Sequence, residues 1–298
     1  MRWTPGGESS DIEDRRGESG GGGFGGLRLG LGGTVILLVL SLIFHKDLFT
    51  LLGSGDATTT ASADTSAPPV NESPAEHREV QFVSFVLDDA QQTWAKILQQ
   101  EGEPWHPAKL VLFRDGVQSG CGEAETAMGP FYCPLDEKVY IDLGFFDELR
   151  DRFGAPGEFA QAYVLAHELG HHVQHLEGID QQMRRLQKSH PDEVNALSVE
   201  LELQADCYAG VWGHSTEQRQ LLEPGDIESG LQAAASVGDD RLQRQTTGRV
   251  SPESFTHGTS AQRAAWFKRG FDSGDPKACD TFSSSAAETR SSDAARVP

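Results

Sequence analysis

A run of sixteen residues without a charged side chain, residues 29–44 (LGLGGTVILLVLSLIF), places the strongest constraint on how this chain folds. At about 1.5 Å of helical rise per residue the run is roughly 24 Å long, slightly less than the roughly 30 Å hydrocarbon core of a bilayer. A second apolar stretch, residues 48–52, extends it if Lys46 snorkels to the membrane surface. Such a run either crosses a membrane or lies buried in a protein core.

The segments on either side of the run offer few partners for a buried helix. GGGGFGG precedes it and TTTASADTSAPPVNESP follows it, and both compositions are typical of flexible chain. We therefore predict a transmembrane signal anchor over residues 29–52. The basic residues that precede the run are Arg2, Arg15, Arg16 and Arg28. Because only Lys46 lies between the run and Arg78, the positive-inside rule predicts a cytoplasmic N-terminus and a single crossing.

The larger C-terminal part of the chain is then expected outside the cytoplasm, in the periplasm or the extracellular space. A signal peptide cut after Ala61-Ser62-Ala63 would place it on the same side, but the stretch before the apolar run is long for one. The predicted segments are a disordered cytoplasmic tail (1–28), the anchor (29–52), a flexible linker (53–77), one globular domain (78–282) and a disordered tail (283–298).

Composition narrows the function classes. The chain has 298 residues, and 37% of them are hydrophobic, which is enough for a folded core. Its formal net charge of −20 excludes a nucleic-acid partner, because such proteins need a basic face to neutralise phosphates. An acidic surface is ordinary for a soluble enzyme domain and by itself names no activity.

The globular part changes from strands to helices along its length. A helical pattern over residues 80–100 precedes three predicted strands, 109–114, 131–133 and 139–143, the last two joined by a turn. The helices predicted after them are 145–153, 158–175, 192–212, 226–237 and 260–271. A small antiparallel sheet followed by a helical body indicates an α+β fold.

The motif His167-Glu168-Leu169-Gly170-His171 lies on the second of these predicted helices. Positions i and i+4 share one helix face, so both imidazoles can reach one zinc ion, and Glu168 can accept a proton from a zinc-bound water. Gly170 costs about 1 kcal/mol relative to alanine in a helix, which favours a packing or access role. The alternative is a chance match to a short pattern.

Two more histidines follow the motif. His172 and His175 are interpreted as surface residues or hydrogen-bonding partners rather than metal ligands. His175 nevertheless continues the helix face of His171, so it is the candidate fourth protein ligand if the site is purely structural.

A third zinc ligand is expected on the next long helix. Glu202 and Asp206 form an E-x-x-x-D pair among apolar neighbours, which disfavours a solvated helix face. Glu202 is the candidate ligand, and Asp206, one turn later, can accept a hydrogen bond from a ligand imidazole and fix its orientation. Glu200 is the competing ligand, ranked second because Gln204 stands four residues after it.

These two motifs together resemble the gluzincin metallopeptidases. The segments SGCGEAETAMGPFYCPLDEKVYIDLGFF, GAPGEFAQAYVLAHELGHHVQHLEG, ELQADCYAGVW and FTHGTSAQRAAWFKRGF resemble the bacterial putative neutral zinc metallopeptidase family more closely. The resemblance implies a zincin-like domain over residues 78–282, an N-terminal membrane anchor and one Zn²⁺ ion. It also matches His167, His171 and Glu202 to the zinc ligands, and Glu168 and Asp206 to the general base and the supporting acid.

A donor for the oxyanion of the tetrahedral intermediate is also needed. His257 is the candidate, and a packing or capping role is the alternative for it. The tyrosines ranked behind it are Tyr140, Tyr163 and Tyr208. Arg263 is expected to pair with a nearby acid instead.

The strand at 139–143 is a candidate sheet edge for an extended peptide, with an ordinary internal strand as the alternative.

The four cysteines are interpreted as two disulfides. Cys121 and Cys133 lie twelve residues apart near a hairpin, and Cys207 and Cys279 would tie the ligand helix to the C-terminal segment. A thiolate zinc site is the alternative, disfavoured because the sequence contains no C-x-x-C.

The sequence therefore predicts a membrane-anchored zinc metalloendopeptidase that acts on a peptide or protein substrate outside the cytoplasm. A zinc amidase or deacylase with the same ligands is one alternative. A metal-stabilised binding or assembly module without activity is the other, and it would close the fourth zinc position with a protein ligand.

Overall fold

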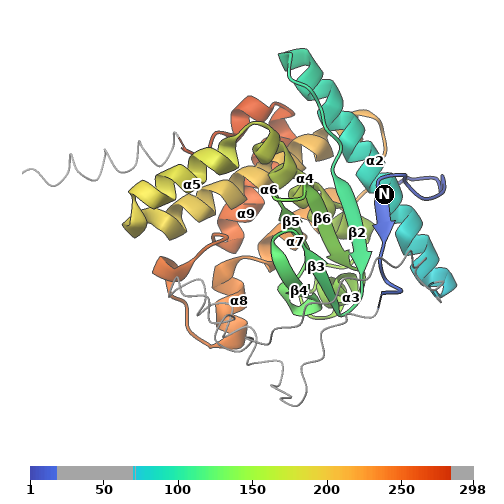
Figure 1. Ribbon diagram of the computed structural model, residues 1–298, viewed down its shortest axis with the longest axis horizontal. Helices are drawn as coiled ribbons and strands as arrows, with labels where there is room; N and C mark the ends of the chain where they lie inside the picture. The colour runs from blue at the N-terminus through green and yellow to red at the C-terminus, as the bar shows by residue number, and fades with distance from the viewer. Residues whose placement is uncertain (19–69, 71, 283–298) are drawn as a thin grey trace, which may run out of the picture.

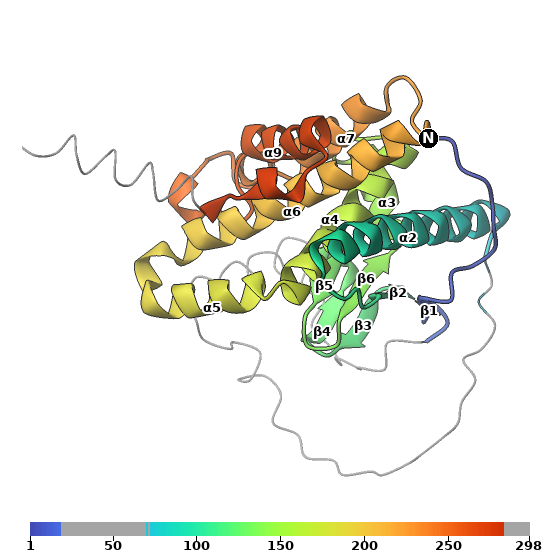
Figure 2. The ribbon, with the colours of Figure 1, turned by 90° about the horizontal axis from the view of Figure 1, so that it is seen from above.

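The computed structural model describes residues 1–18, 70 and 72–282 (Figure 1). The predicted anchor at 29–52, residues 53–69 and 71 of the predicted linker, and the C-terminal tail at 283–298 lie outside these residues. None of the helices in the described ranges combines the length and the apolar character that a membrane crossing requires. Figure 2 shows a small sheet at one side of the molecule and the helical body at the other, which confirms the mixed α+β class.

The main sheet has the strand order β1-β2-β6-β5, with bounds Ile12–Asp14, Lys109–Phe113, Lys138–Asp142 and Phe131–Cys133. Strands β1, β2 and β6 are parallel, and only β5 pairs antiparallel with β6. The prediction of an antiparallel sheet is therefore wrong for two of the three strand pairings and confirmed for the pairing of β5 with β6. The reason is burial: β2 and β6 are covered on both faces, and such apolar strands are typical of parallel pairing.

The N-terminal arm, residues 1–18, packs on the domain instead of forming the start of a disordered tail. Its strand β1 pairs with β2, with Ile12 opposite Leu110, and the Trp3 ring lies 5.3 Å from that of Phe82. The buried Arg16 side chain donates hydrogen bonds to three carboxylates, those of Asp14, Glu72 and Glu76. A three-residue strand with two acidic residues has no local signal, because these tertiary contacts hold it.

Eight α-helices are described: α2 (Pro74–Glu101), α3 (Gly144–Asp151), α4 (Glu158–Leu176), α5 (Ile179–Ser189), α6 (Val194–Gln218), α7 (Asp226–Ser236), α8 (Asp239–Thr246) and α9 (Ser260–Ser273). All the predicted helices are present. Helices α5 and α8 and the hairpin of β3 (Gly116–Ser119) and β4 (Gly122–Glu125) were not predicted. Helix α6 also continues to Gln218, whereas the predicted helix ended at residue 212.

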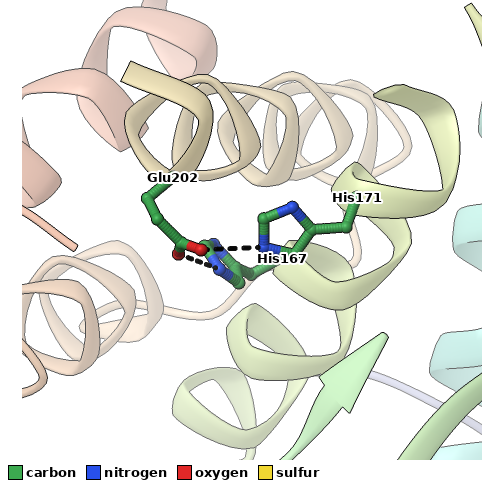
Figure 3. A group of neighbouring side chains, drawn as sticks. All are labelled: His167, His171 and Glu202. Atoms are coloured by element: carbon green, nitrogen blue, oxygen red, sulfur yellow. Dashed lines mark ion pairs between the residues drawn. The ribbon is translucent and has the colours of Figure 1, made fainter. Parts of the chain in front are cut away.

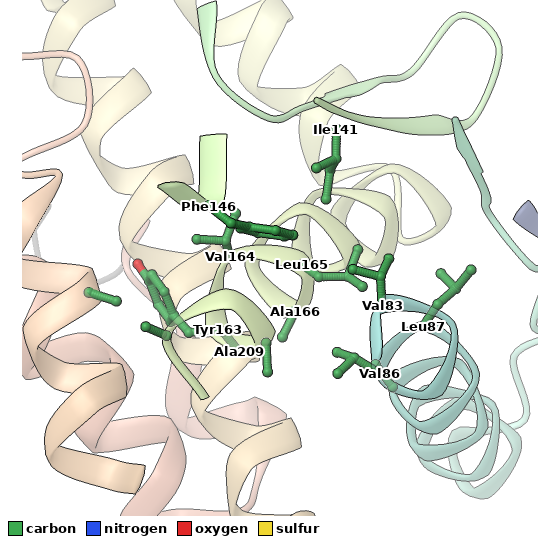
Figure 4. Close-up of a cluster of buried hydrophobic side chains, with 14 of the residues drawn as sticks. Val83, Val86, Leu87, Ile141, Phe146, Tyr163, Val164, Leu165, Ala166 and Ala209 are labelled. Atoms are coloured by element: carbon green, nitrogen blue, oxygen red, sulfur yellow. The ribbon is translucent and has the colours of Figure 1, made fainter. Parts of the chain in front are cut away.

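The hydrophobic core lies between α2, the sheet and α4. In Figure 4, Val83 and Leu87 of α2 lie opposite Leu165 of α4, with Ile141 of β6 beside them. The other face of the sheet packs on the β3–β4 hairpin. The core therefore holds α4, the helix that carries H-E-x-x-H, against a sheet that is covered on both sides.

Glycines allow the helices around α6 to approach at backbone distance. A Cβ on Gly210 of α6 would lie 2.0 Å from the carbonyl oxygen of Phe267, and one on Gly270 of α9 would lie 1.9 Å from that of Cys207. A Cβ on Gly170 would lie 3.0 Å from the carbonyl oxygen of Ala205, so the predicted packing role of this glycine is confirmed. Helices α4 and α9 thus contact α6 on the segment that carries the acidic pair.

Both predicted disulfides are present. The bond between Cys121 and Cys133 ties the turn of the β3–β4 hairpin to the edge strand β5. The bond between Cys207 and Cys279 ties α6 to the segment that follows α9. The second bond closes a loop of 72 residues, and long loops lose the most unfolded-state freedom in the chain-entropy account of disulfide stability.

Candidate metal centre

Three side chains from two helices converge at one point (Figure 3). His167 and His171 project from α4, and Glu202 projects from α6. The His167 Nε2 atom lies 3.2 Å from Glu202 Oε2, and His171 Nε2 lies 3.5 Å from Glu202 Oε1. One ligand atom from each residue lies within 4.8 Å of the other two. The structure therefore brings together the two histidines and the acid that the sequence predicted, and it selects Glu202 over Glu200.

This donor set fits a zinc ion. Two imidazole nitrogens and one carboxylate oxygen are typical of catalytic zinc sites, which leave the fourth position to water or substrate. In the described part of the chain, no further His, Cys, Asp or Glu joins the group. His175, the candidate fourth ligand, instead contacts Asp180, with Nδ1 2.9 Å from Oδ2.

Each imidazole is oriented by an acceptor at its Nδ1 atom. His167 Nδ1 lies 2.9 Å from Asp206 Oδ1, and His171 Nδ1 lies 2.8 Å from Gln174 Oε1. Because both partners accept hydrogen bonds, we assign the proton to Nδ1 in each ring, which leaves both Nε2 atoms for a metal. Asp206 was predicted from its spacing. Gln174 was not, although its position three residues after His171 on the same helix was an available signal.

Burial and charge act in opposite directions on these groups. Burial lowers the pKa of His167, but Asp206 and Glu202 outweigh it and raise this pKa to about 10. Burial raises the pKa of Glu202, but His171 and His257 outweigh it, so this pKa is well below its usual value. A proton and a divalent cation compete for the same imidazole nitrogens, so metal binding at this centre should release protons.

Glu168 lies between the two histidines on α4 and is only 7% exposed. Burial raises its pKa and Glu202 raises it further, whereas His167 and His171 lower it. The carboxylate is therefore within electrostatic range of the three candidate ligands, as expected for a group that exchanges protons beside the metal.

The loop that carries His257 is held by one buried carboxylate. Asp239 Oδ2 accepts hydrogen bonds from the backbone nitrogens of Thr256, His257 and Gly258, at 2.7, 2.6 and 3.2 Å. Its Oδ1 atom lies 3.3 Å from His257 Nδ1. Burial lowers the pKa of His257, but Glu202 and Asp239 raise it overall. The imidazole is 48% exposed and within electrostatic range of Glu202, so it can meet a substrate at the centre.

The alternative oxyanion donors have other partners. The hydroxyl of Tyr140 donates to Asp136, that of Tyr208 to Glu177, and that of Tyr163 to Asp206.

The strand at 139–143 is not an edge of the sheet as predicted, because β6 lies between β2 and β5. The edge of the sheet on that side is β5.

His172 links the metal helix to that edge strand. Its Nε2 atom lies 2.6 Å from the carbonyl oxygen of His106, which fixes the proton on Nε2. The Nδ1 atom therefore accepts a hydrogen bond from the hydroxyl of Tyr132 in β5, at 2.9 Å. His172 is thus a hydrogen-bonding partner and not a ligand.

Comparison with known proteins gives one family. Residues 1–282 match the family described as "Putative neutral zinc metallopeptidase". The chain is similar to the uncharacterized protein YpfJ of Escherichia coli K12, with 48% identity over 291 residues, covering 96% of this chain and all of that protein. It is also similar to the uncharacterized protein Rv2575 of Mycobacterium tuberculosis H37Rv, with 49% identity over 185 residues, covering 58% of this chain and 62% of that protein. No solved structure matches the chain.

Proposed function

Because the chain belongs to the putative neutral zinc metallopeptidase family, we propose that it is a zinc-dependent endopeptidase that uses Glu168 as its general base. The observation that carries the proposal is the cluster of His167, His171 and Glu202, with the carboxylate of Glu168 beside it. Two helices that are packed at backbone distance hold these groups, so they are pre-organised for a metal.

The chain's own residues can carry out the proton transfers of peptide hydrolysis. A zinc ion held by His167, His171 and Glu202 would lower the pKa of its bound water towards about 7. Glu168 accepts the proton of the attacking water and then donates it to the leaving amine. His257, which Asp239 holds in place, donates a hydrogen bond to the oxyanion as it forms.

The geometry favours an enzyme over a structural zinc module. A structural site usually closes its fourth position with a protein ligand. The candidate for that role, His175, pairs with Asp180 instead. A buried acid beside the ligands, Glu168, also has no purpose in a purely structural site. A zinc amidase or deacylase with the same groups differs only in substrate, so a substrate screen separates it from a peptidase.

We also propose that the domain works outside the cytoplasm, on a peptide or protein substrate. Its two disulfides support this location, because disulfides persist in oxidising compartments. The single-pass anchor at 29–52 stays a prediction from the sequence, and it requires that strand β1 is not paired with β2. The net charge of −20 continues to argue against a nucleic-acid partner.

The purified chain should bind one zinc ion per molecule and lose peptide hydrolysis when the ion is removed. We expect a chelator to abolish cleavage of unstructured peptides and added zinc to restore it. Glu202→Gln should weaken zinc binding by more than the roughly 10–100-fold that loss of an outer hydrogen-bond partner costs. Zinc content by atomic absorption and cleavage of a fluorogenic peptide library measure both effects.

Glu200→Gln is the matched control, because it removes a neighbouring carboxylate on the same helix and should leave zinc affinity unchanged. Hydrolysis that persists in the fully chelated protein would contradict the proposal. Cleavage of acylated small molecules, with none of any peptide, would favour the amidase or deacylase.

His257→Ala should lower kcat by about 10²–10³-fold with little change in KM, the usual effect of losing an oxyanion donor. Because Glu202 and Asp239 raise the pKa of His257, its positive charge is present below that pKa and is lost as pH rises. The wild-type activity should therefore fall on the alkaline side, and this part of the kcat profile should be absent in the variant. His190→Ala replaces an exposed histidine after α5 and should change neither kcat nor the pH profile of kcat. An unchanged kcat in His257→Ala would assign the histidine to packing.

A further inference from the structure

We propose that Arg263 is a positioning residue of the metal centre, which fixes the carboxylate of Asp206 and through it the ring of His167. This inference rests on the proposed zinc site. Neither of the two ligand helices contains Arg263; it lies in the first turn of α9. It therefore adds a third helix to the centre, one that contributes no ligand.

The contact between Arg263 and Asp206 is a buried two-point ion pair. Arg263 Nε lies 2.8 Å from Asp206 Oδ2, and Nη2 lies 2.9 Å from Oδ1. The arginine side chain is 4% exposed and that of the aspartate is fully buried. A planar guanidinium that meets both carboxylate oxygens fixes the plane of the carboxylate, which a single hydrogen bond or a lysine ammonium does not.

That carboxylate in turn orients His167. Asp206 Oδ1 accepts a hydrogen bond from His167 Nδ1 at 2.9 Å, and it also accepts one from the hydroxyl of Tyr163. If the carboxylate rotated, Oδ1 would move away from Nδ1, and the ring would no longer direct Nε2 towards Glu202. Arg263 Nη2 also lies 3.4 Å from His167 Nδ1 and 3.5 Å from His167 Nε2. Arg263 therefore holds the ring of His167 both through Asp206 and by direct contact.

The packing of α9 explains how Arg263 reaches this position. Gly210 and Gly270 allow α6 and α9 to cross at backbone contact, and a capping box between Thr259 and Gln262 fixes the first turn of α9. Arg263 Nη1 also donates to the carbonyl oxygen of Val237 at 3.4 Å. The side chain is therefore directed at Asp206 by its own helix and the neighbouring loop.

A positioning role and a purely electrostatic role predict opposite changes in zinc affinity when Arg263 is removed. Arg263 is a cation close to a cation site, so if charge alone mattered its removal would strengthen zinc binding. If it positions Asp206, its removal weakens zinc binding, because His167 loses its fixed orientation. The expected loss is about 10-fold or more, within the range for partners outside the ligand set.

The test compares Arg263→Met and Arg263→Lys with the full-length wild-type chain. Zinc affinity is measured by competition with a chromophoric chelator, and ligand geometry by the visible absorption spectrum of the Co²⁺ form. We expect both variants to bind zinc at least about 10-fold more weakly, with an altered Co²⁺ spectrum, because lysine keeps the charge but not the two-point contact. Tyr163→Phe keeps the two-point contact between Arg263 and Asp206, so it should lose less zinc affinity.

Arg219→Met is the matched control, because Arg219 forms another ion pair with a buried aspartate, Asp89, away from the ligands. It should lower thermal stability without changing zinc affinity or the Co²⁺ spectrum. Tighter zinc binding in Arg263→Met, or a wild-type affinity in Arg263→Lys, would overturn the inference. If Arg263→Met does not fold, Arg263→Lys decides. If the wild-type chain itself binds no zinc, the proposed function fails rather than this inference.

Discussion

Replacing Glu168 with glutamine should abolish peptide hydrolysis and leave the metal in place. The amide has nearly the same size as the carboxylate but cannot accept the proton of the attacking water. We expect kcat to fall by at least about 10²–10⁴-fold, the usual contribution of a positioned acid or base. Zinc affinity should change little, because Glu168 is not among the three candidate ligands. Parallel assays of fluorogenic peptide cleavage and zinc content measure the two quantities.

Glu177→Gln is the control for Glu168→Gln. Glu177 follows the same helix, and burial raises its pKa too, but its partner is the hydroxyl of Tyr208 rather than the metal centre. Its replacement should leave kcat near the wild-type value. Peptide cleavage by Glu168→Gln at the wild-type rate would show that another group accepts the proton, and the proposed mechanism would be wrong.

Gly270→Ala should destabilise the fold strongly, although it adds only one methyl group. The new Cβ would lie 1.9 Å from the carbonyl oxygen of Cys207 and 3.0 Å from the nitrogen of Val211, so the backbones of α6 and α9 must separate. Overpacking typically costs about 1–3 kcal/mol, and we expect about 3 kcal/mol or more because the obstacle is backbone. Thermal unfolding followed by circular dichroism measures the loss.

The same variant should also weaken zinc binding, because moving α9 withdraws Arg263 from Asp206. Gly116→Ala is the control: in β3 its Cβ would meet only the carbonyl oxygen of Ala124, at 3.5 Å. That change should alter the free energy of unfolding by no more than about 1 kcal/mol. If Gly270→Ala unfolded at the same temperature as Gly116→Ala and bound zinc normally, the close crossing of α6 and α9 would not be needed for the site.

Local patterns predicted most of the metal centre. The two histidines share one helix and one face, so their spacing alone placed them together. Glu202 and Asp206 could be predicted in the same way, because they have the same i, i+4 spacing on a second predicted helix. The groups that orient the centre from outside the motifs were harder to find, because Arg263 and Asp239 act across long sequence separations. Nothing in the sequence near either residue indicates which buried partner it meets.

The sheet shows the same division between local and distant contacts. The antiparallel pair of β5 and β6 follows from a short turn and was predicted. The parallel partners of β2 were not, because the chain between β2 and β6 passes through a separate hairpin and the edge strand β5. Strand β1 was missed because its three residues gain their structure from Arg16 and the carboxylates around it rather than from their own pattern.

The pairing of β1 with β2 also decides how often the chain between them can pass through a bilayer. Residues 1–18 pack on residues 72–282 as one folded body. The parts of the chain before and after the apolar run therefore lie on the same side of any membrane. A chain that leaves one side and returns to it crosses an even number of times. Residues 29–52 would span about 36 Å as a helix, enough for one crossing of a roughly 30 Å core but not for two. In any one molecule, a docked N-terminal strand and a single-pass anchor therefore exclude each other.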